Sequence, residues 1–206
     1  MNQPALTVVE SQTAAVREAL ERPIEEATGL PGEWYSSERW ARTESRKLFA
    51  RTWLCVGFVH ELAQPGTVIP VDIAGFPLLL TCNHNKVQQA FHNVCPHRGS
   101  RLVNVACVGK PIIKCPYHAW AFDMDGGLRS TPHWGGYREH ELAGFDPACH
   151  GLHPIRCELW NQWLFVNIDG QAPPLSEYIE PFARHFVEYD LERIVHCQTV
   201  PFEIPG

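Results

Sequence analysis

The chain has 206 residues, of which 45% are hydrophobic and 19% are charged, so it can build an apolar core and is not a disordered protein. Its 17 Lys and Arg residues against 23 Asp and Glu residues give a net charge of −6, which argues against nucleic acid as the main partner. No segment approaches the roughly 20 consecutive apolar residues of a membrane helix, so no membrane partner is expected.

Residues 1–35 are predicted to form an N-terminal arm, for which a docked helix over 9–21 and a mobile segment remain alternatives. Residues 1–10 have neither the basic start nor the apolar centre of a secretory signal, so we expect a cytoplasmic protein. After this arm, Ser36 or Ser37 can cap a helix predicted over 38–50.

Residues 36–170, which include that helix, are predicted to form one mainly β domain. Short apolar runs separated by Gly, Pro and Asn indicate antiparallel strands, arranged as a sandwich or a small barrel. The strands are predicted at 53–59, 67–73, 76–82, 86–93, 111–114, 120–124, 128–130 and 160–168. Residues 131–154 are expected to be irregular, and Asp125-Gly126-Gly127 is a hairpin turn signal.

Residues 171–206 are predicted to be a linker and the start of a further domain. Pro173 and Pro174 make a stiff connection, and 176–189 are expected to form one or two short helices broken at Pro181. Residues 195–204 are expected to be extended.

The eight cysteines are scattered among apolar runs. This pattern favours a reducing compartment in which most thiols are buried as small apolar side chains. Cys95 and Cys115 differ from the other six, because each lies in a Pro-containing loop beside a histidine.

The two loops read Cys95-Pro96-His97-Arg98-Gly99 and Cys115-Pro116-Tyr117-His118, which gives a C-x-H motif, seventeen residues, and a C-x2-H motif. Thiolate and imidazole in equal number suit zinc or an iron–sulfur cluster. A structural zinc finger usually pairs Cys with Cys and His with His, whereas each loop here offers one of each. A two-iron cluster of Rieske type, with two thiolates on one iron and two imidazoles on the other, requires this mixed order.

The two motifs resemble those of the Rieske oxygenases, specifically the large (alpha) subunit of ring-hydroxylating and related non-haem iron oxygenases. The similarity extends to Phe91-His92-Asn93-Val94, to 123–128 and to 163–167, and spans about 34–193. The resemblance implies a mainly β, Rieske-type iron–sulfur domain of small antiparallel sheets. Two cluster-binding loops, a helical N-terminal lead and a helical C-terminal tail complete that fold.

The resemblance also implies a ligand set and an activity. Cys95 and Cys115 would bind one iron of a [2Fe–2S] cluster, and His97 and His118 the other. The cluster would pass electrons from a reductase or ferredoxin to a mononuclear iron in an oxygenase catalytic domain or a neighbouring alpha subunit.

The residues that would hold that mononuclear iron are not found in this sequence. We find no His-x4-His pair with a nearby carboxylate: His150 and His153 near Asp146 do not fit, and neither do His185 and His196. We therefore predict no catalytic residue in this chain, and mononuclear iron only in a domain outside it. A fragment and a natural short form remain open, and so do a stand-alone ferredoxin-like carrier and a structural zinc domain.

The sequence departs from the family at Ala119, where the family usually has Gly, and it lacks the cysteines of the disulfide clamp of respiratory Rieske proteins.

Trp120 is expected to shield the cluster or to pack in the core. The Tyr117 hydroxyl is expected to donate to a sulfur or to face solvent. Cys107 is the candidate for a disulfide or a spare ligand. An aromatic group is expected to form a docking surface or to cover the core, and it consists of His133, Trp134, Tyr137 and His140.

Overall fold

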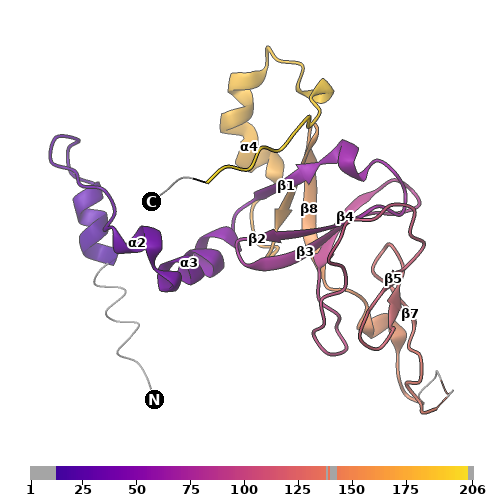
Figure 1. Cartoon of the computed structure of the whole chain (residues 1–206). Helices are drawn as coiled ribbons and strands as arrows, with labels where there is room; N and C mark the ends of the chain where they lie inside the picture. Colours follow the sequence, from indigo (N-terminus) through magenta and orange to yellow (C-terminus); the bar gives the residue numbers. More distant parts are fainter. Residues whose placement is uncertain (1–12, 138, 140–142, 204–206) are drawn as a thin grey trace, which may run out of the picture. The chain divides into compact units, whose positions relative to one another are not determined.

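The computed structural model describes residues 13–137, 139 and 143–203 (Figure 1). The chain divides into two compact units, Met1–Arg46 and Lys47–Gly206. Within the described residues, no helix is both long enough and apolar enough to cross a membrane.

The first unit is helical. Residues 13–20 form a helix, and α2 (Glu33–Ser36) and α3 (Glu38–Glu44) follow it. Trp34 stacks on the buried Trp40 with ring centroids 3.8 Å apart. The predicted helix over 38–50 is found as α3 continued by the π-helical turn η1 (Ser45–Phe49). Residues 1–12 of the predicted arm lie outside the described residues.

The second unit is built on a six-stranded antiparallel sheet with the strand order β1-β9-β8-β4-β3-β2. Its strands are β1 (Leu54–Phe58), β2 (Val68–Ile73), β3 (Phe76–Cys82), β4 (Gln88–His92), β8 (Pro154–Trp160) and β9 (Trp163–Asn167). Leu78 and Leu80 of β3 pack into one apolar cluster with Leu164 and Val166, while Leu79 packs into another. The uninterrupted Leu78–Leu80 run therefore reflects a strand that is buried on both faces.

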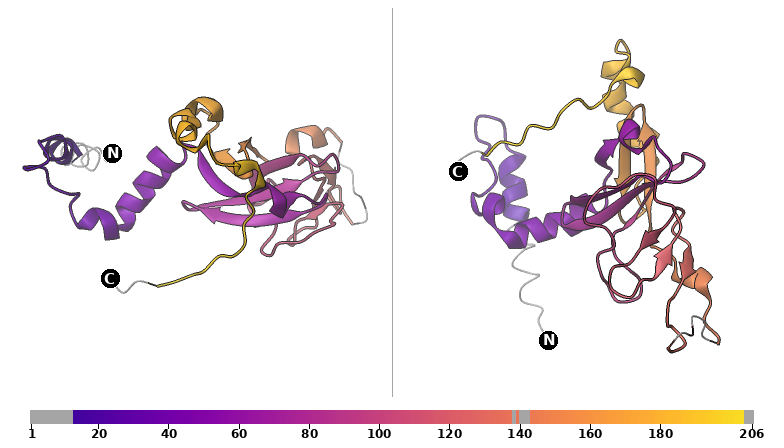
Figure 2. Two further views of the ribbon diagram at one scale, coloured as in Figure 1. Left: turned by 90° about the horizontal axis from the view of Figure 1, so that it is seen from above. Right: turned by 45° about the vertical axis from the view of Figure 1, so that its right-hand side comes forward.

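A small sheet, ordered β5-β6-β7, lies at the end of this unit opposite α4, as Figure 1 and the right-hand view of Figure 2 show. Its strands are β5 (Ile113–Lys114), β6 (Ala121–Phe122) and β7 (Leu128–Ser130). The predicted turn at Asp125-Gly126-Gly127 joins β6 to β7. Gly126 is required there because its φ is +84° and a Cβ would lie 2.5 Å from Cε1 of Phe91.

One strand of the large sheet was not predicted. The predicted strand over 160–168 is wrong at its start, because a turn at Asn161, with φ 50°, separates β9 from β8. The run that forms β8 alternates apolar Ile155, Cys157 and Leu159 with polar Arg156 and Glu158, which is a strand pattern that the prediction did not use. Arg156 pairs with Glu158 at 2.6 Å, and Glu158 accepts a hydrogen bond from the N–H of Leu175 at 3.0 Å.

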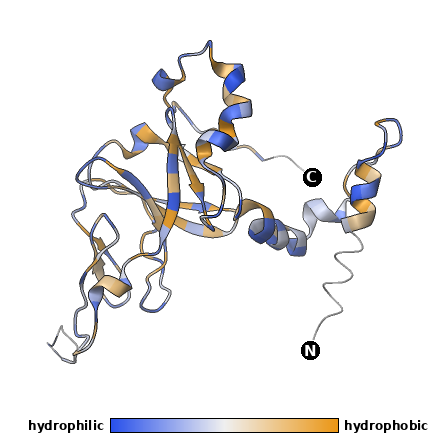
Figure 3. Cartoon of the chain, turned by 180° about the vertical axis from the view of Figure 1, so that it is seen from behind, coloured by the Kyte–Doolittle hydropathy of each residue, from blue (hydrophilic) through white to orange (hydrophobic). Residues whose placement is uncertain are grey.

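The C-terminal tail packs on the large sheet through α4 (Leu175–Ala183), whose apolar and polar residues alternate (Figure 3). Leu175 and Ile179 are buried against Trp53. The predicted break at Pro181 is wrong: α4 continues to Ala183, because the proline removes one backbone donor while the buried face still holds the helix. The short 3-10 segments of this unit are η2 (Val59–Leu62), η3 (Pro147–His150), η4 (Arg184–Phe186) and η5 (Leu191–Arg193).

An apolar pocket of about 640 Å³ lies between α4 and the sheet, with Trp160, Trp163 and Phe182 in its wall. Beyond η5 the described residues form no regular structure. His196 holds this segment against η2, since its Nδ1 lies 3.0 Å from Oε1 of Glu61 and its ring stacks on Phe58.

Candidate metal centre

The two motif loops have the same backbone hydrogen bonds. The N–H of Cys95 donates to the carbonyl of Ser100 at 2.8 Å, and the carbonyl of Cys95 accepts from Gly99 at 2.9 Å. In the second loop the N–H of Cys115 donates to the carbonyl of Trp120 at 2.8 Å, and its carbonyl accepts from Ala119 at 3.1 Å. The two cysteines are therefore presented by equivalent turns.

Both turns need a left-handed residue four places after the cysteine. Gly99 has φ 69° and Ala119 has φ 59°. A residue with a Cβ in this conformation costs about 1–2 kcal/mol relative to its right-handed form. Ala119, the departure from the family pattern, thus adopts the same turn as Gly99 despite its methyl group.

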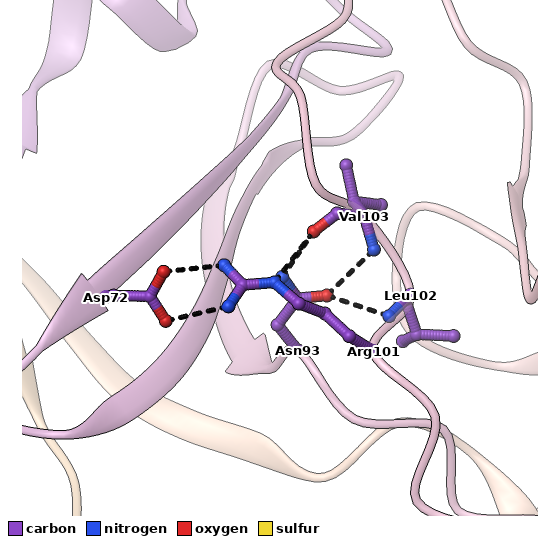
Figure 4. A network of polar contacts seen from close by, with 5 residues as sticks. All are labelled: Asp72, Asn93, Arg101, Leu102 and Val103. Atoms are coloured by element: carbon purple, nitrogen blue, oxygen red, sulfur yellow. Dashed lines mark hydrogen bonds and ion pairs between the residues drawn. The ribbon is translucent and has the colours of Figure 1, made fainter.

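A buried asparagine closes the first loop (Figure 4). Oδ1 of Asn93 accepts from the N–H groups of Leu102 at 3.2 Å and Val103 at 3.0 Å, and its Nδ2 donates to the carbonyl of Val103 at 2.7 Å. Arg101 extends this network to β2 with a bidentate pair to Asp72 at 2.9 and 2.7 Å. The second loop has different support, because it connects β5 to β6, which pair directly.

The two thiols lie together in the core: Cys95 is 1% exposed and Cys115 is 2% exposed. Burial raises the pKa of the Cys95 thiol. The backbone N–H groups of His97 and Arg98 act against this, while contact with Cys115 raises the pKa further. Backbone donors aimed at a sulfur stabilise its thiolate form, which is the form that binds metals.

The two imidazoles also form a pair, with ring centroids 4.7 Å apart. Burial, followed by the nearby His118 and Arg98, lowers the pKa of His97 and favours its neutral form. Nδ1 of His118 is buried and has no hydrogen-bond partner among the described residues. An unsatisfied buried nitrogen costs about 1–3 kcal/mol. A bound metal would remove this cost, because a neutral imidazole binds metals through a ring nitrogen.

The structure therefore brings the four predicted ligand residues together as one thiol pair and one imidazole pair. Within the described residues, no three His, Cys, Asp or Glu side chains are grouped so that they could hold a single ion. Two ligands for each of two irons is the arrangement that this donor set fits.

Aromatic rings surround His97. Trp120, 2% exposed, stacks on it at 4.6 Å with an interplanar angle of 5°. Trp134 lies 5.0 Å from His97 and nearly perpendicular to it, and Phe145 lies 5.6 Å from Trp134. Sequence reasoning named Trp134 only as part of an aromatic group, and its contact with His97 had no local signal. His140, from the same predicted group, lies outside the described residues.

Tyr117 covers the other histidine. Its ring centroid lies 3.7 Å from that of His118, and the residue is 59% exposed.

Cys107 pairs with Val68 through backbone hydrogen bonds and packs against the core beside the loops. All eight cysteines are free thiols. Most thiols were expected to be buried, but three of the six cysteines outside the two motifs are exposed: Cys55, Cys149 and Cys197.

Two of the other histidines named from the sequence, His150 and His196, have contacts of their own. Nδ1 of His150 lies 3.0 Å from the carbonyl oxygen of Asp146, and the His150 ring packs 4.4 Å from Phe145. His196 is held by Glu61, as described above. Each of these two histidines thus contacts an oxygen atom and an aromatic ring.

Comparison with known proteins places this geometry in context. Residues 52–141 match the Rieske [2Fe-2S] domain family. The carnitine monooxygenase oxygenase subunit of Escherichia coli K12 is 34% identical over 75% of this chain and 40% of its own length. The glycine betaine monooxygenase oxygenase subunit of Chromohalobacter salexigens is 30% identical over 92% of this chain and 42% of its own length. The chain thus spans about two fifths of the length of these relatives.

Solved structures share the fold. The quaternary ammonium Rieske monooxygenase CntA in complex with gamma-butyrobetaine superposes with a TM-score of 0.70 and 31% identity, over 79% of this chain and 45% of that one. Naphthalene 1,2-dioxygenase with indole bound superposes with a TM-score of 0.66 and 27% identity, over 74% of this chain and 34% of that one. The matched part of each structure is therefore less than half of its chain.

Proposed function

The chain belongs to the Rieske [2Fe–2S] family of oxygenase subunits, and from that premise we propose that its two loops hold a Rieske cluster that carries one electron at a time. Cys95 and Cys115 bind one iron, and His97 and His118 bind the other. The observation that carries this proposal is the orphaned Nδ1 of His118, which lies beside His97 in a loop equivalent to the first one.

The residues of the chain perform three tasks in this proposal. The backbone N–H groups of His97 and Arg98 stabilise the thiolate of Cys95. Trp120 and Trp134 keep water from the His97 side. Tyr117 covers His118 but is itself exposed, so the edge of this histidine ring is the short route to the surface. When bound, the cluster supplies one-electron transfer.

We extend the proposal to the place of this chain in a larger enzyme. The donor is a reductase or ferredoxin, and the acceptor is a mononuclear iron in an oxygenase catalytic domain or a neighbouring alpha subunit. The names of the relatives, which are oxygenase subunits, support this extension. Within the chain, we assign residues 1–35 to an arm, 36–170 to the Rieske domain and 171–206 to a linker and the start of the catalytic domain. The cytoplasm is the proposed compartment.

The test is spectroscopic. Protein reconstituted without oxygen from iron and sulfide should contain about two of each per chain. After reduction with dithionite it should give a rhombic EPR signal with the low average g value of a mixed Cys/His cluster. Zinc in a colourless protein, or failure to take up iron under these conditions, would contradict the proposal.

A variant assigns the ligand. His118→Cys replaces the imidazole of the second loop with a thiolate, so the mixed-ligand EPR signal should disappear. His84→Cys is the matched control, because His84 is exposed in the turn between β3 and β4. The control should keep the wild-type signal. A His118→Cys protein with an unchanged signal would remove His118 from the ligand set.

A further inference from the structure

We propose that the indole N–H of Trp134 donates a hydrogen bond to a sulfur of the cluster and raises its reduction potential. This inference rests on the proposed function, since it needs a cluster beside His97. It assigns to Trp134 a role that the sequence suggested only for the Tyr117 hydroxyl. Tyr117 is 59% exposed, so solvent can satisfy its hydroxyl, whereas the indole nitrogen of Trp134 is buried.

The first observation is an unsatisfied donor. Nε1 of Trp134 is buried and has no hydrogen-bond partner among the described residues. An indole nitrogen is only a donor, so it needs an acceptor and cannot be satisfied by another N–H. A buried donor without an acceptor costs about 1–3 kcal/mol, so we expect the folded protein to supply an acceptor for this N–H.

The second observation is the set of neighbours that cannot serve as acceptors. The ring of Trp134 lies 5.1 Å from Trp120 and 5.6 Å from Phe145. The interplanar angle between the rings of Trp120 and Trp134 is 83°. The angle between the rings of His97 and Trp134 is 87°. Trp120 and Phe145 have no lone-pair acceptor to offer, and the third ring beside Trp134 is His97 of the first ligand loop.

The third observation is that two buried ring nitrogens without a hydrogen-bond partner belong to residues that pack against the same histidine. Nδ1 of His118 has no hydrogen-bond partner, and the N–H at Nε1 of Trp134 has no acceptor among the described residues. His97 is the common neighbour of both residues, at 4.7 Å from His118 and 5.0 Å from Trp134 between ring centroids. A metal–sulfur group beside His97 would satisfy both, because iron would bind the imidazole nitrogen and a sulfur would accept the hydrogen bond from the indole N–H.

The hydrogen bond has a predictable effect. A donor to a cluster sulfur stabilises the reduced state, which is more negative than the oxidised one, and so raises the reduction potential. Trp134 therefore acts as a positioning residue that tunes the cluster, and it is not a ligand.

The experiment compares two variants of the reconstituted chain. Trp134→Phe removes the N–H and keeps an aromatic ring, so the midpoint potential from an EPR-monitored redox titration should fall below the wild-type value. Phe145→Leu disturbs the packing around Trp134 but leaves the N–H, and its potential should stay closer to wild type. Equal potentials in wild type and Trp134→Phe would overturn the inference.

A second measurement needs no stable variant. Proton ENDOR on the reduced wild-type protein, in H2O and in D2O, should reveal an exchangeable coupling from the indole proton, and Trp134→Phe should lose it. A wild-type protein whose exchangeable couplings are all accounted for by backbone N–H groups would overturn the inference and leave the proposed function intact. A wild-type protein with no Rieske signal would overturn the proposed function, and the inference with it.

Discussion

Gly99 and Ala119 occupy the same place in two loops that share one hydrogen-bond pattern, yet only one of them is glycine. Both have a left-handed backbone, with φ 69° and 59°. No atom lies within 4 Å of the position that a Cβ at Gly99 would take. Exchanging glycine and alanine at these two positions therefore changes backbone strain without adding a clash at the first loop.

We expect Gly99→Ala to lower the free energy of unfolding by about 1 kcal/mol and Ala119→Gly to raise it by a similar amount. Urea denaturation of the metal-free chain measures both. The double exchange should return to nearly the wild-type stability, since the strain moves from one loop to the other. Destabilisation by both single changes would mean that the loops are not equivalent.

At the scale of elements, the β6–β7 hairpin connects the second loop to the core of the large sheet. Gly126 in its turn lies against Phe91 of β4, which is 3% exposed. The carbonyl of Gly126 also accepts a hydrogen bond from the N–H of Leu152 at 2.8 Å. This turn therefore joins the small sheet, β4 and the segment before β8.

Gly126→Ala should lower the free energy of unfolding by about 2–5 kcal/mol, because it adds a core clash to left-handed strain. Gly170→Ala is the matched control: Gly170 has φ 69° and no atom within 4 Å of a Cβ, so only the strain of about 1 kcal/mol remains. Chemical denaturation of the two variants side by side makes the comparison. Equal losses would show that Phe91 moves aside freely.

The same elements show what a sequence can and cannot predict. β2 and β3 were predicted within one residue of their ends because apolar runs and turn residues bound them. β8 was missed although Ile155, Cys157 and Leu159 alternate with Arg156 and Glu158, because the predicted strand began only at residue 160. The local pattern could not show that Glu158 accepts a hydrogen bond from the N–H of Leu175, at the start of α4.

The candidate site likewise has residues that the sequence predicts and residues whose roles it does not predict. Its four proposed ligand residues were identified from two short motifs. The roles of Asn93, Arg101 and Trp134 depend on contacts made only after folding, such as the ion pair of Arg101 with Asp72 on β2.

At the scale of the molecule, the second unit holds all four proposed ligands of the cluster. The hydrophobic clusters of the described residues consist of side chains from beyond Lys47. Both sheets and both ligand loops also lie there. α4 adds Leu175 and Ile179 to the cluster around Trp53, and the indole of Trp53 donates to the carbonyl of Pro173 at 2.9 Å.

A chain that begins at Lys47 should therefore assemble the same cluster, with an EPR signal that matches the full chain. A chain that ends at Gly170 is the contrasting truncation, since it exposes Trp53 and removes the acceptor of its indole. We expect it to unfold at a lower urea concentration. Loss of the signal on removal of the first 46 residues would contradict this division.

The first ligand loop has one further consequence, which concerns solubility. β2 is an outer strand of the large sheet, and the exposed backbone of such a strand can recruit another chain. Here Cys107 forms both backbone hydrogen bonds of Val68, and Pro70 has no N–H to offer. The guanidinium of Arg101 pairs with the carboxylate of Asp72 beside them. Alternate residues of a strand direct their backbone groups to the same side, so these three positions block one continuous edge. The chain from Cys95 to Cys107, together with Pro70 of β2, thus also protects the sheet against edge-to-edge aggregation.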